Sequence, residues 1–189
     1  MSRPDPMRVM VVNGATREQG NTDAITNTFI DGAREAGHDV QAAVLRELVI
    51  SDCIGCCTCK REQRCHFEDD MTGLRDMVTT SDALVLSSPL YFCEVTGLMK
   101  VFLDRLYFFY HPENKHMTSG KKVLIMTPMG EKEAGFETQI IEEFYRRFLK
   151  ALEMILLDMF FFTNLMEKDS FSKHHDELVR AYTLGSTLH

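Results

Sequence analysis

The chain has 189 residues, of which 44% are hydrophobic and 26% are charged, and its formal net charge is −7. This length suits one domain with a full hydrophobic core, and the composition is ordinary for a globular protein. The acidic balance argues against a nucleic-acid-binding domain, because such a domain needs a basic surface to displace counterions from phosphates.

No stretch of the sequence is long and apolar enough to cross a bilayer, and the N-terminal residues lack the apolar core of a secretion signal. We therefore expect a cytoplasmic protein. In such a reducing compartment disulfides are disfavoured, and clustered cysteines are more often ligands or catalysts.

In chain order, alternating strands and helices are predicted after a loose leader at residues 1–7. The strands are short, uniformly apolar runs at residues 8–14, 39–45, 83–89, 121–130 (with its loop) and 154–162. Apolar residues four apart indicate helices at residues 22–37 and 136–152, an acidic N-terminus indicates one at 71–81, and a segment apolar on most sides indicates one at 97–109. A closing helix is expected at residues 169–184. Such alternation is typical of a parallel sheet covered on both faces. We predict a single doubly wound α/β domain with a five-stranded sheet in the order 2-1-3-4-5, which binds its ligand outside the carboxyl ends of the strands.

The first loop at that edge, residues 13–22, leaves a strand and opens a helix. It holds two glycines, the polar side chains of Thr16, Asn21 and Thr22, and the charge of Arg17. Amides at a helix N-terminus, together with the helix dipole, form a phosphate site. The loop lacks the glycine spacing of dinucleotide folds and the G-K-[ST] ending of nucleotide-triphosphate loops, so a monophosphate fits better. The alternative is an ordinary capped turn.

Two further loops converge on the same edge. Residues 87–97 carry Pro89, Tyr91 and Phe92, and an aromatic side chain beside backbone amides can hold a flat heteroaromatic ring. The alternative is that both aromatics only pack on the neighbouring helix. The loop at residues 127–131 is small and contains a glycine. Together the three loops predict a site that none of them would predict alone.

The sequence contains, in order, GATREQGNT, CIGCCTC, SSPLYFCEVTGLMKVFLDR and TPMG. This series resembles the flavodoxin-like NAD(P)H-dependent FMN reductases, and especially their iron–sulfur flavoprotein branch, over roughly residues 8–130. The resemblance implies a flavodoxin-like FMN-binding domain over residues 8–189 with a cysteine-rich insert at 53–65. It also implies a homodimer or homotetramer.

The same resemblance assigns FMN-binding residues. Those implied at the phosphate are Thr16, Arg17, Gly20, Asn21 and Thr22. Those implied at the ribityl chain and the isoalloxazine ring are Pro89, Leu90, Tyr91 and Phe92, with Thr127 and Gly130 on the other side of the ring. Lys100, Asp104 and Arg105 match motif positions on the following helix, where we expect them to serve helix and subunit packing.

Five of the six cysteines fall between residues 53 and 65. Cys53, Cys56, Cys59 and Cys65 form the pattern C-x2-C-x2-C-x5-C, and Cys57 is out of register. Four thiolates this close together suit a [4Fe–4S] cluster. Two alternatives stay open: a four-cysteine zinc site, and free or redox-active thiols without metal.

The function that these observations predict is an FMN-dependent oxidoreductase in which the flavin performs the chemistry and no catalytic side chain is required. NAD(P)H would supply electrons, and a small molecule or a protein would accept them, with the cluster as a one-electron outlet. The alternatives are a flavodoxin-type electron carrier without a nicotinamide site and a flavin-holding or metal-sensing module. The aromatic run at residues 106–112 is expected at a dimer contact, or else at the end of a core helix.

Overall fold

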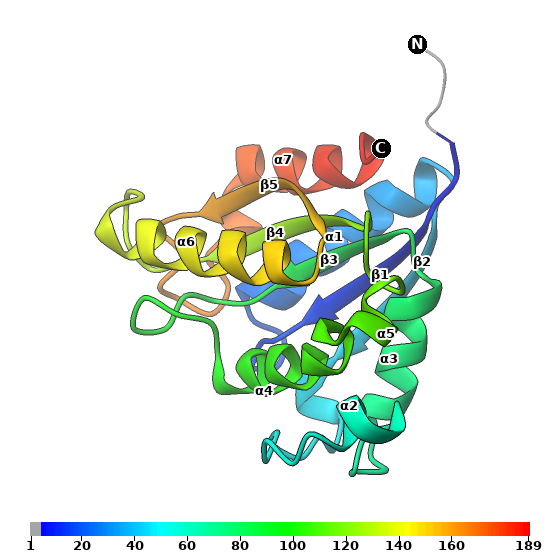
Figure 1. The fold of residues 1–189 in the computed structure, drawn as a ribbon. Coiled ribbons are helices and arrows are strands. Elements are labelled where there is room, and N and C mark those ends of the chain that lie inside the picture. Colours follow the sequence, from blue (N-terminus) through cyan, green and yellow to red (C-terminus); the bar gives the residue numbers. More distant parts are fainter. Residues whose placement is uncertain (1–4) are drawn as a thin grey trace.

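Five parallel strands form one sheet in the order β2-β1-β3-β4-β5 (Figure 1). The structure is a computed structural model that describes residues 5–189, so residues 1–4 of the expected leader lie outside the described residues. The strands are β1 (Arg8–Asn13), β2 (Asp39–Val44), β3 (Ala83–Ser87), β4 (Lys122–Pro128) and β5 (Ile155–Phe162). The predicted fold class and strand order are confirmed.

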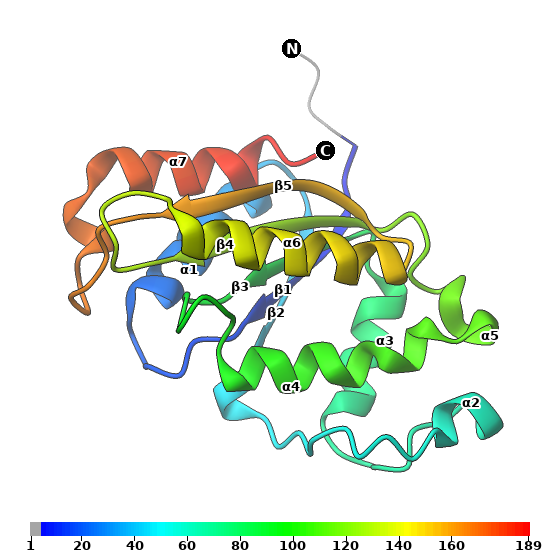
Figure 2. The same cartoon turned by 60° about the vertical axis from the view of Figure 1, so that its left-hand side comes forward.

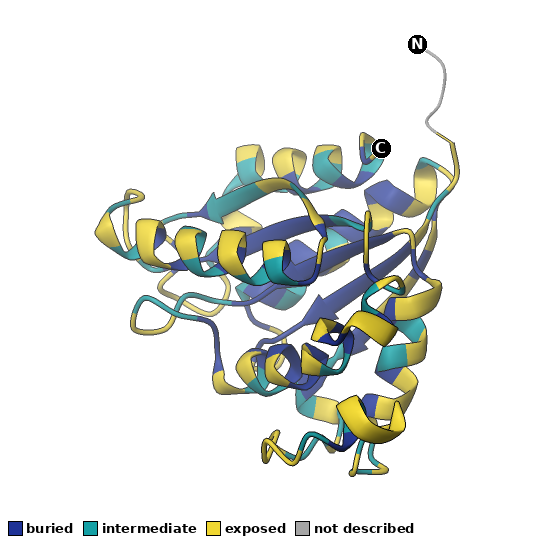
Figure 3. Cartoon of the chain, viewed as in Figure 1, coloured by how far each residue is buried: buried dark blue, intermediate teal, exposed yellow. Residues whose placement is uncertain are grey.

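Helices cover both faces of the sheet (Figure 2). One face carries α1 (Asn21–Glu35) and α7 (His175–Ser186), and the other carries α3 (Met71–Thr80), α4 (Gly97–Arg105) and α6 (Phe136–Ala151). Successive side chains of a strand point to opposite faces. In β1, Val9 and Val11 therefore join the core under α1, while Met10 and Val12 join the core under α4. This is why the central strands read as uninterrupted apolar runs, and why Figure 3 shows them buried along their length.

Two predicted helices have different limits in the structure. The helix expected at residues 97–109 ends at Arg105 and continues as the 3₁₀ helix Leu106–Tyr110. Pro112 starts the short helix α5 (Pro112–Lys115), and His111 before it is extended, because a residue preceding proline is kept out of the helical region. The closing helix begins at His175 instead of residue 169, and Phe171–Lys173 forms a separate 3₁₀ turn whose Phe171 side chain is fully buried.

The segment between β2 and α3 contains two short elements that the sequence did not predict. Leu45–Glu47 is a 3₁₀ helix, and α2 (Thr58–Glu62) lies inside the cysteine segment. Left-handed residues flank α2 on both sides, Cys57 at φ 55° and Gln63 at φ 53°. Over residues 5–189, no helix combines the length and the apolar character that crossing a membrane requires.

Candidate functional site

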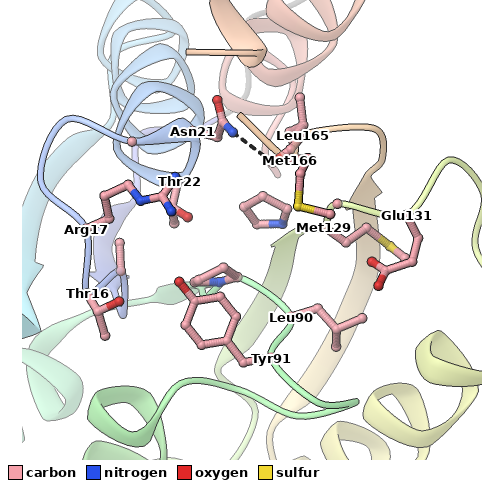
Figure 4. Close-up of a pocket in the computed structure, with 15 residues that line it drawn as sticks. Thr16, Arg17, Asn21, Thr22, Leu90, Tyr91, Met129, Glu131, Leu165 and Met166 are labelled. Atoms are coloured by element: carbon pink, nitrogen blue, oxygen red, sulfur yellow. Dashed lines mark hydrogen bonds between the residues drawn. The ribbon is translucent and has the colours of Figure 1, made fainter. Parts of the chain in front are cut away.

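A cavity of about 240 Å³ opens at the carboxyl edge of the sheet, between the loops that follow β1, β3, β4 and β5 (Figure 4). All the predicted FMN-binding residues line it except Phe92 and Thr127. Thr127 is buried within β4. The residues that sequence reasoning missed are Ala15, Pro128, Met129, Glu131, Leu165 and Met166.

The N-terminus of α1 forms one wall of this cavity. Its N-cap is Gly20, which offers no side-chain cap, and the first backbone hydrogen bond of the helix runs from Ala24 N to Gly20 O at 3.1 Å. The amides of the first turn therefore have no acceptor within the helix. Thr22 and Arg17 line the same space, so the helix end combines free amides, a hydroxyl, a guanidinium and the positive pole of the dipole. This donor set fits a phosphate group.

Asp23 is the acidic residue of that first turn, and its carboxylate is engaged by neighbouring residues. Its carboxylate accepts hydrogen bonds from Gln19 N at 2.7 Å and Asn13 Nδ2 at 2.7 Å, and it pairs with Arg46 at 2.9 Å. These contacts fix the shape of the loop after β1 and neutralise a charge that would repel an anion.

Asn21 has a contact set that its sequence position did not indicate. Its Nδ2 donates to Leu165 O at 3.0 Å (Figure 4) and to Glu167 O at 2.6 Å, and its Oδ1 accepts from Phe171 N at 2.9 Å. The side chain thus holds the loop after β5, which supplies Leu165 and Met166 to the cavity. No local pattern pointed to this wall, because it lies 144 residues from Asn21 in the sequence.

The loops after β3 and β4 form the opposite part of the cavity. Leu90 N donates to Pro128 O at 2.9 Å, and Met129 N donates to Phe162 O at 2.9 Å, so the loop ends are tied to one another. Pro89, Leu90 and Tyr91 line the cavity together with Met129 and Gly130. An apolar slot with a half-exposed tyrosine at its rim suits a flat aromatic ring that stays partly accessible to solvent.

Phe92 stands outside this slot, with its side chain fully exposed. Tyr91 and Glu94 exchange backbone hydrogen bonds of 2.8 and 3.0 Å around a two-residue turn, in which Phe92 and Cys93 have φ values of 48° and 66°. Both values belong to the left-handed region of a type I′ turn, which asparagine and glycine adopt most readily. This turn places the Phe92 side chain outside the cavity.

Helix α4 connects the loops of the cavity through its N-cap, Thr96. Thr96 Oγ1 donates to Gly14 O at 2.6 Å and accepts from Met99 N at 3.2 Å, while Thr96 N donates to Ser88 Oγ at 3.1 Å. A Cβ atom on Gly14 would lie 2.8 Å from Met99 Cβ, so the loop needs a glycine for this close approach. The spacing between the loop after β1 and the loop after β3 therefore depends on α4.

The cysteine segment forms a second site below the C-terminal end of α4. Cys53, Cys56, Cys57, Cys59 and Cys65 line one small cavity of about 30 Å³, together with Phe67, Arg105 and Tyr107. All six cysteines are free thiols. Among residues 5–189, no three or more His, Cys, Asp or Glu side chains are arranged to hold a metal ion directly. The five cysteines of this segment line one space without forming a metal-ligand set.

The thiols of the segment differ in their surroundings. Thr58 Oγ1 lies 3.3 Å from Cys56 Sγ, and this hydrogen bond lowers the pKa of Cys56. Burial raises the pKa of Cys59. The Cys57 thiol lies 3.5 Å from Gly55 O. Sequence reasoning assigned Arg105 to packing, whereas the structure gives its guanidinium direct contacts to this segment.

A family model described as NADPH-dependent FMN reductase matches residues 7–161. An iron-sulfur flavoprotein of Archaeoglobus fulgidus is 28% identical over 138 residues, which cover 72% of this chain and 63% of that protein. An iron-sulfur flavoprotein of Clostridioides difficile is 34% identical over 102 residues, which cover 52% of this chain and 45% of that protein. The matches thus span less than two thirds of these curated relatives.

Among solved structures, an NAD(P)H:quinone oxidoreductase from Methanothermobacter marburgensis superposes with a TM-score of 0.75 at 18% identity, covering 97% of this chain and 96% of that chain. At this identity the similarity shows the fold. The sequence match, in contrast, extends over most of the chain and includes the loops after β1, β3 and β4. The chain belongs to the NADPH-dependent FMN reductase family.

Proposed function

We propose that the chain is an FMN-dependent oxidoreductase that takes electrons from NAD(P)H and passes them to a small-molecule or protein acceptor, through a [4Fe–4S] cluster held by Cys53, Cys56, Cys59 and Cys65. The observation that carries the proposal is the uncapped N-terminus of α1, which shares one cavity with the apolar slot between the loops after β3 and β4. Family membership supports both the flavin and the nicotinamide nucleotide.

When bound, FMN would supply the hydride and electron-transfer chemistry. The residues of the chain would bind and orient it. Arg17, Thr16, Thr22 and the first-turn amides of α1 would hold the phosphate. Pro89 to Tyr91 and Met129 with Gly130 would flank the ring and keep one edge open to solvent. Asn21 would act through the loop after β5, which its hydrogen bonds hold against the cavity.

The names of the curated relatives, iron-sulfur flavoproteins, support the cluster. So does the gathering of all five segment cysteines around one cavity, with Cys57 as the member that the ligand spacing omits. Helix α4 separates the two sites. Its nine residues begin beside the flavin loops and end at Arg105, and at 1.5 Å per residue they span roughly 14 Å.

Anaerobic purification followed by analysis of flavin, iron, sulfide and zinc tests the proposal. We expect about one FMN and about four iron and four sulfide per chain. NADH or NADPH should then bleach the flavin band without added protein. If dithionite bleaches the flavin but neither nucleotide does, the chain is a flavodoxin-type carrier. Zinc in place of iron and sulfide would reject the cluster and leave the flavin assignment standing.

A homodimer or homotetramer in the cytoplasm forms part of this proposal. The aromatic run after α4 divides in the structure, with Leu106 and Phe109 in the core while Tyr107 and Tyr110 stack at 5.5 Å on the surface. These two tyrosines line an open apolar groove of about 470 Å³ with Leu103 and Phe148. Light scattering behind a sizing column gives the mass, and a monomer at all concentrations would reject the oligomer.

A further inference from the structure

Arg105 is the last residue of α4, and its side chain is only 2% exposed. Its Nη1 donates to Ser51 O at 2.6 Å and to Asp69 Oδ2 at 2.7 Å. Its Nη2 donates to Asp69 Oδ1 at 3.0 Å and to Cys65 Sγ at 3.3 Å. One buried guanidinium therefore contacts a backbone carbonyl, a carboxylate and one of the four proposed ligand thiols.

Ser51 and Asp69 are the two ends of the cysteine segment, and they also contact each other. Ser51 N donates to Asp69 Oδ2 at 3.0 Å, and Met71 N donates to Asp69 Oδ1 at 3.2 Å. The planar group of Arg105 also lies 5.2 Å above the ring of Phe67. The segment thus leaves the sheet and returns to α3 at a single junction, with Arg105 and Asp69 at its centre.

A purely structural role does not explain this arrangement well. Burying a charged pair costs much of what the pair gains, and apolar side chains at such positions often give an equally stable protein. Arg105 also donates one hydrogen bond to a sulfur atom, which is a weaker acceptor than the carbonyl and carboxylate oxygens around it. That contact becomes strong when the sulfur is a thiolate, as it is when it binds iron.

We propose that Arg105 is a positioning residue for the cluster: it fastens both ends of the cysteine segment to α4, and its N–H···S hydrogen bond to Cys65 raises the reduction potential of the cluster. The inference rests on the proposed function, because it requires that Cys65 ligate a cluster. Each added electron makes a cluster more negative, so a guanidinium that donates to a ligand sulfur stabilises the reduced form more than the oxidised form.

The test compares Arg105→Gln, Arg105→Lys and the control Arg8→Gln in the full chain. Arg8 also pairs with a carboxylate, Asp82 at 3.2 Å, but both side chains are exposed, and Arg8 is the first residue of β1. The first measurement is the cluster midpoint potential, by anaerobic redox titration followed by electron paramagnetic resonance. The second is amide hydrogen exchange across residues 49–71 in metal-free protein.

We expect Arg105→Gln to disfavour cluster reduction by about tenfold, which is a midpoint about 59 mV more negative for a one-electron couple. Arg105→Lys keeps the charge and should lie between Arg105→Gln and the natural protein. In metal-free Arg105→Gln, exchange should rise within residues 49–71 while the strands keep their protection. Arg8→Gln should change neither quantity.

An Arg105→Gln protein with an unchanged midpoint and unchanged exchange in the segment overturns the inference. So does a midpoint shift of equal size in Arg8→Gln, which would make it an effect of net charge. If Arg105→Gln fails to fold, Arg105→Lys decides alone by the same two measurements. A natural protein that assembles no cluster under anaerobic reconstitution would instead reject the cluster of the proposed function, and the inference about the potential with it, while the flavin assignment would stand.

Discussion

The side-chain nitrogen of Asn21, at the start of α1, lies 3.0 Å from the carbonyl oxygen of Leu165, in the loop after β5. This contact joins the helix end that faces the cavity to the wall that closes it. Asn21 was predicted to bind the FMN phosphate directly. Because its Nδ2 and Oδ1 are both engaged by the loop, we expect it to act by holding that wall in place.

Replacing Asn21 with aspartate should therefore weaken FMN binding by roughly tenfold or more. The change removes a donor to two carbonyl oxygens and puts a negative charge against them, which costs on the order of 1–3 kcal/mol. Quenching of FMN fluorescence by apoprotein gives the dissociation constant. Asn27→Asp is the matched control, since Asn27 is an exposed residue of the same helix. Equal weakening in both variants would indicate a long-range charge effect and contradict the prediction.

Gly14→Ala should destabilise the protein by about 1–3 kcal/mol, because overpacking of a close contact costs that much. The new Cβ would lie 2.8 Å from Met99 Cβ, and α4 would have to shift. Gly73→Ala, in the exposed face of α3 where no atom lies within 4 Å, should instead stabilise by about 0.5–1 kcal/mol. Urea unfolding of the two variants measures both values. A stabilised Gly14→Ala would mean that the loop does not pack on α4 as described.

Strand β1 shows which features of the fold can be predicted from the sequence. Val9 and Met10 face opposite cores, so β1 is an unbroken apolar run, and the alternation of five such strands with helices suggested the strand order. An apolar run does not predict the residue at which the strand ends. At the end of β4, Thr127 is buried in the strand while Pro128 and Met129 line the cavity, so an error of one residue in the end of the strand changes which side chains are assigned to the cavity.

Side-chain contacts between segments that are distant in the sequence, such as that between Arg105 and Asp69, could not be predicted for a different reason. Arg105 reads as an ordinary polar residue near a helix C-terminus, which is a favourable place for a cation. Its partner Asp69 lies 36 residues earlier, in a segment whose path depends on tertiary packing. The end of α4 at Arg105 was not predicted either, because the chain continues as a 3₁₀ helix to Tyr110 and Pro112 restricts only His111.

Asp69→Asn should destabilise metal-free protein by about 3–5 kcal/mol near neutral pH, since it leaves the buried charge of Arg105 without its carboxylate. Burial alone would raise the pKa of Asp69, but hydrogen bonds from Arg105 and from the Ser51 amide outweigh it and lower the pKa. The folded pKa therefore lies below the unfolded value of about 3.9. The ionised carboxylate contributes its full stability above that value and loses it as the pH falls through the folded pKa.

The difference in unfolding free energy between the natural protein and Asp69→Asn should accordingly stay constant from about pH 7 to pH 5 and shrink below about pH 4. Urea titrations across this range measure it. Asp70→Asn serves as the control, because Asp70 is exposed and accepts from Val49 N instead of an arginine. A difference that grows towards low pH would contradict the depressed pKa.

Phe92→Asn should raise stability by about 0.5–1 kcal/mol and leave the FMN dissociation constant unchanged. Phe92 has φ 48°, a value that asparagine tolerates better than phenylalanine, and its exposed ring lies outside the cavity. Tyr91→Ala, which changes a residue of the cavity itself, should weaken FMN binding in the same assay. Loss of affinity in Phe92→Asn would show that the turn rearranges to place Phe92 on the flavin, as the sequence resemblance implies.

The ligand set of the cysteine segment can be tested with two neighbouring positions. Cys59→Ser should lose most iron and sulfide after anaerobic reconstitution, because serine cannot replace a thiolate in the proposed four-cysteine set. Cys57→Ser should keep both, because Cys57 is out of register in C-x2-C-x2-C-x5-C and occupies the left-handed position before α2. Both cysteines line the same cavity and are partly exposed, so a general effect of thiol removal would appear in both variants. Iron and sulfide per FMN are the measured quantities. If Cys57→Ser loses the metal while Cys59→Ser retains it, Cys57 replaces Cys59 in the ligand set, and the spacing of the segment has been misread.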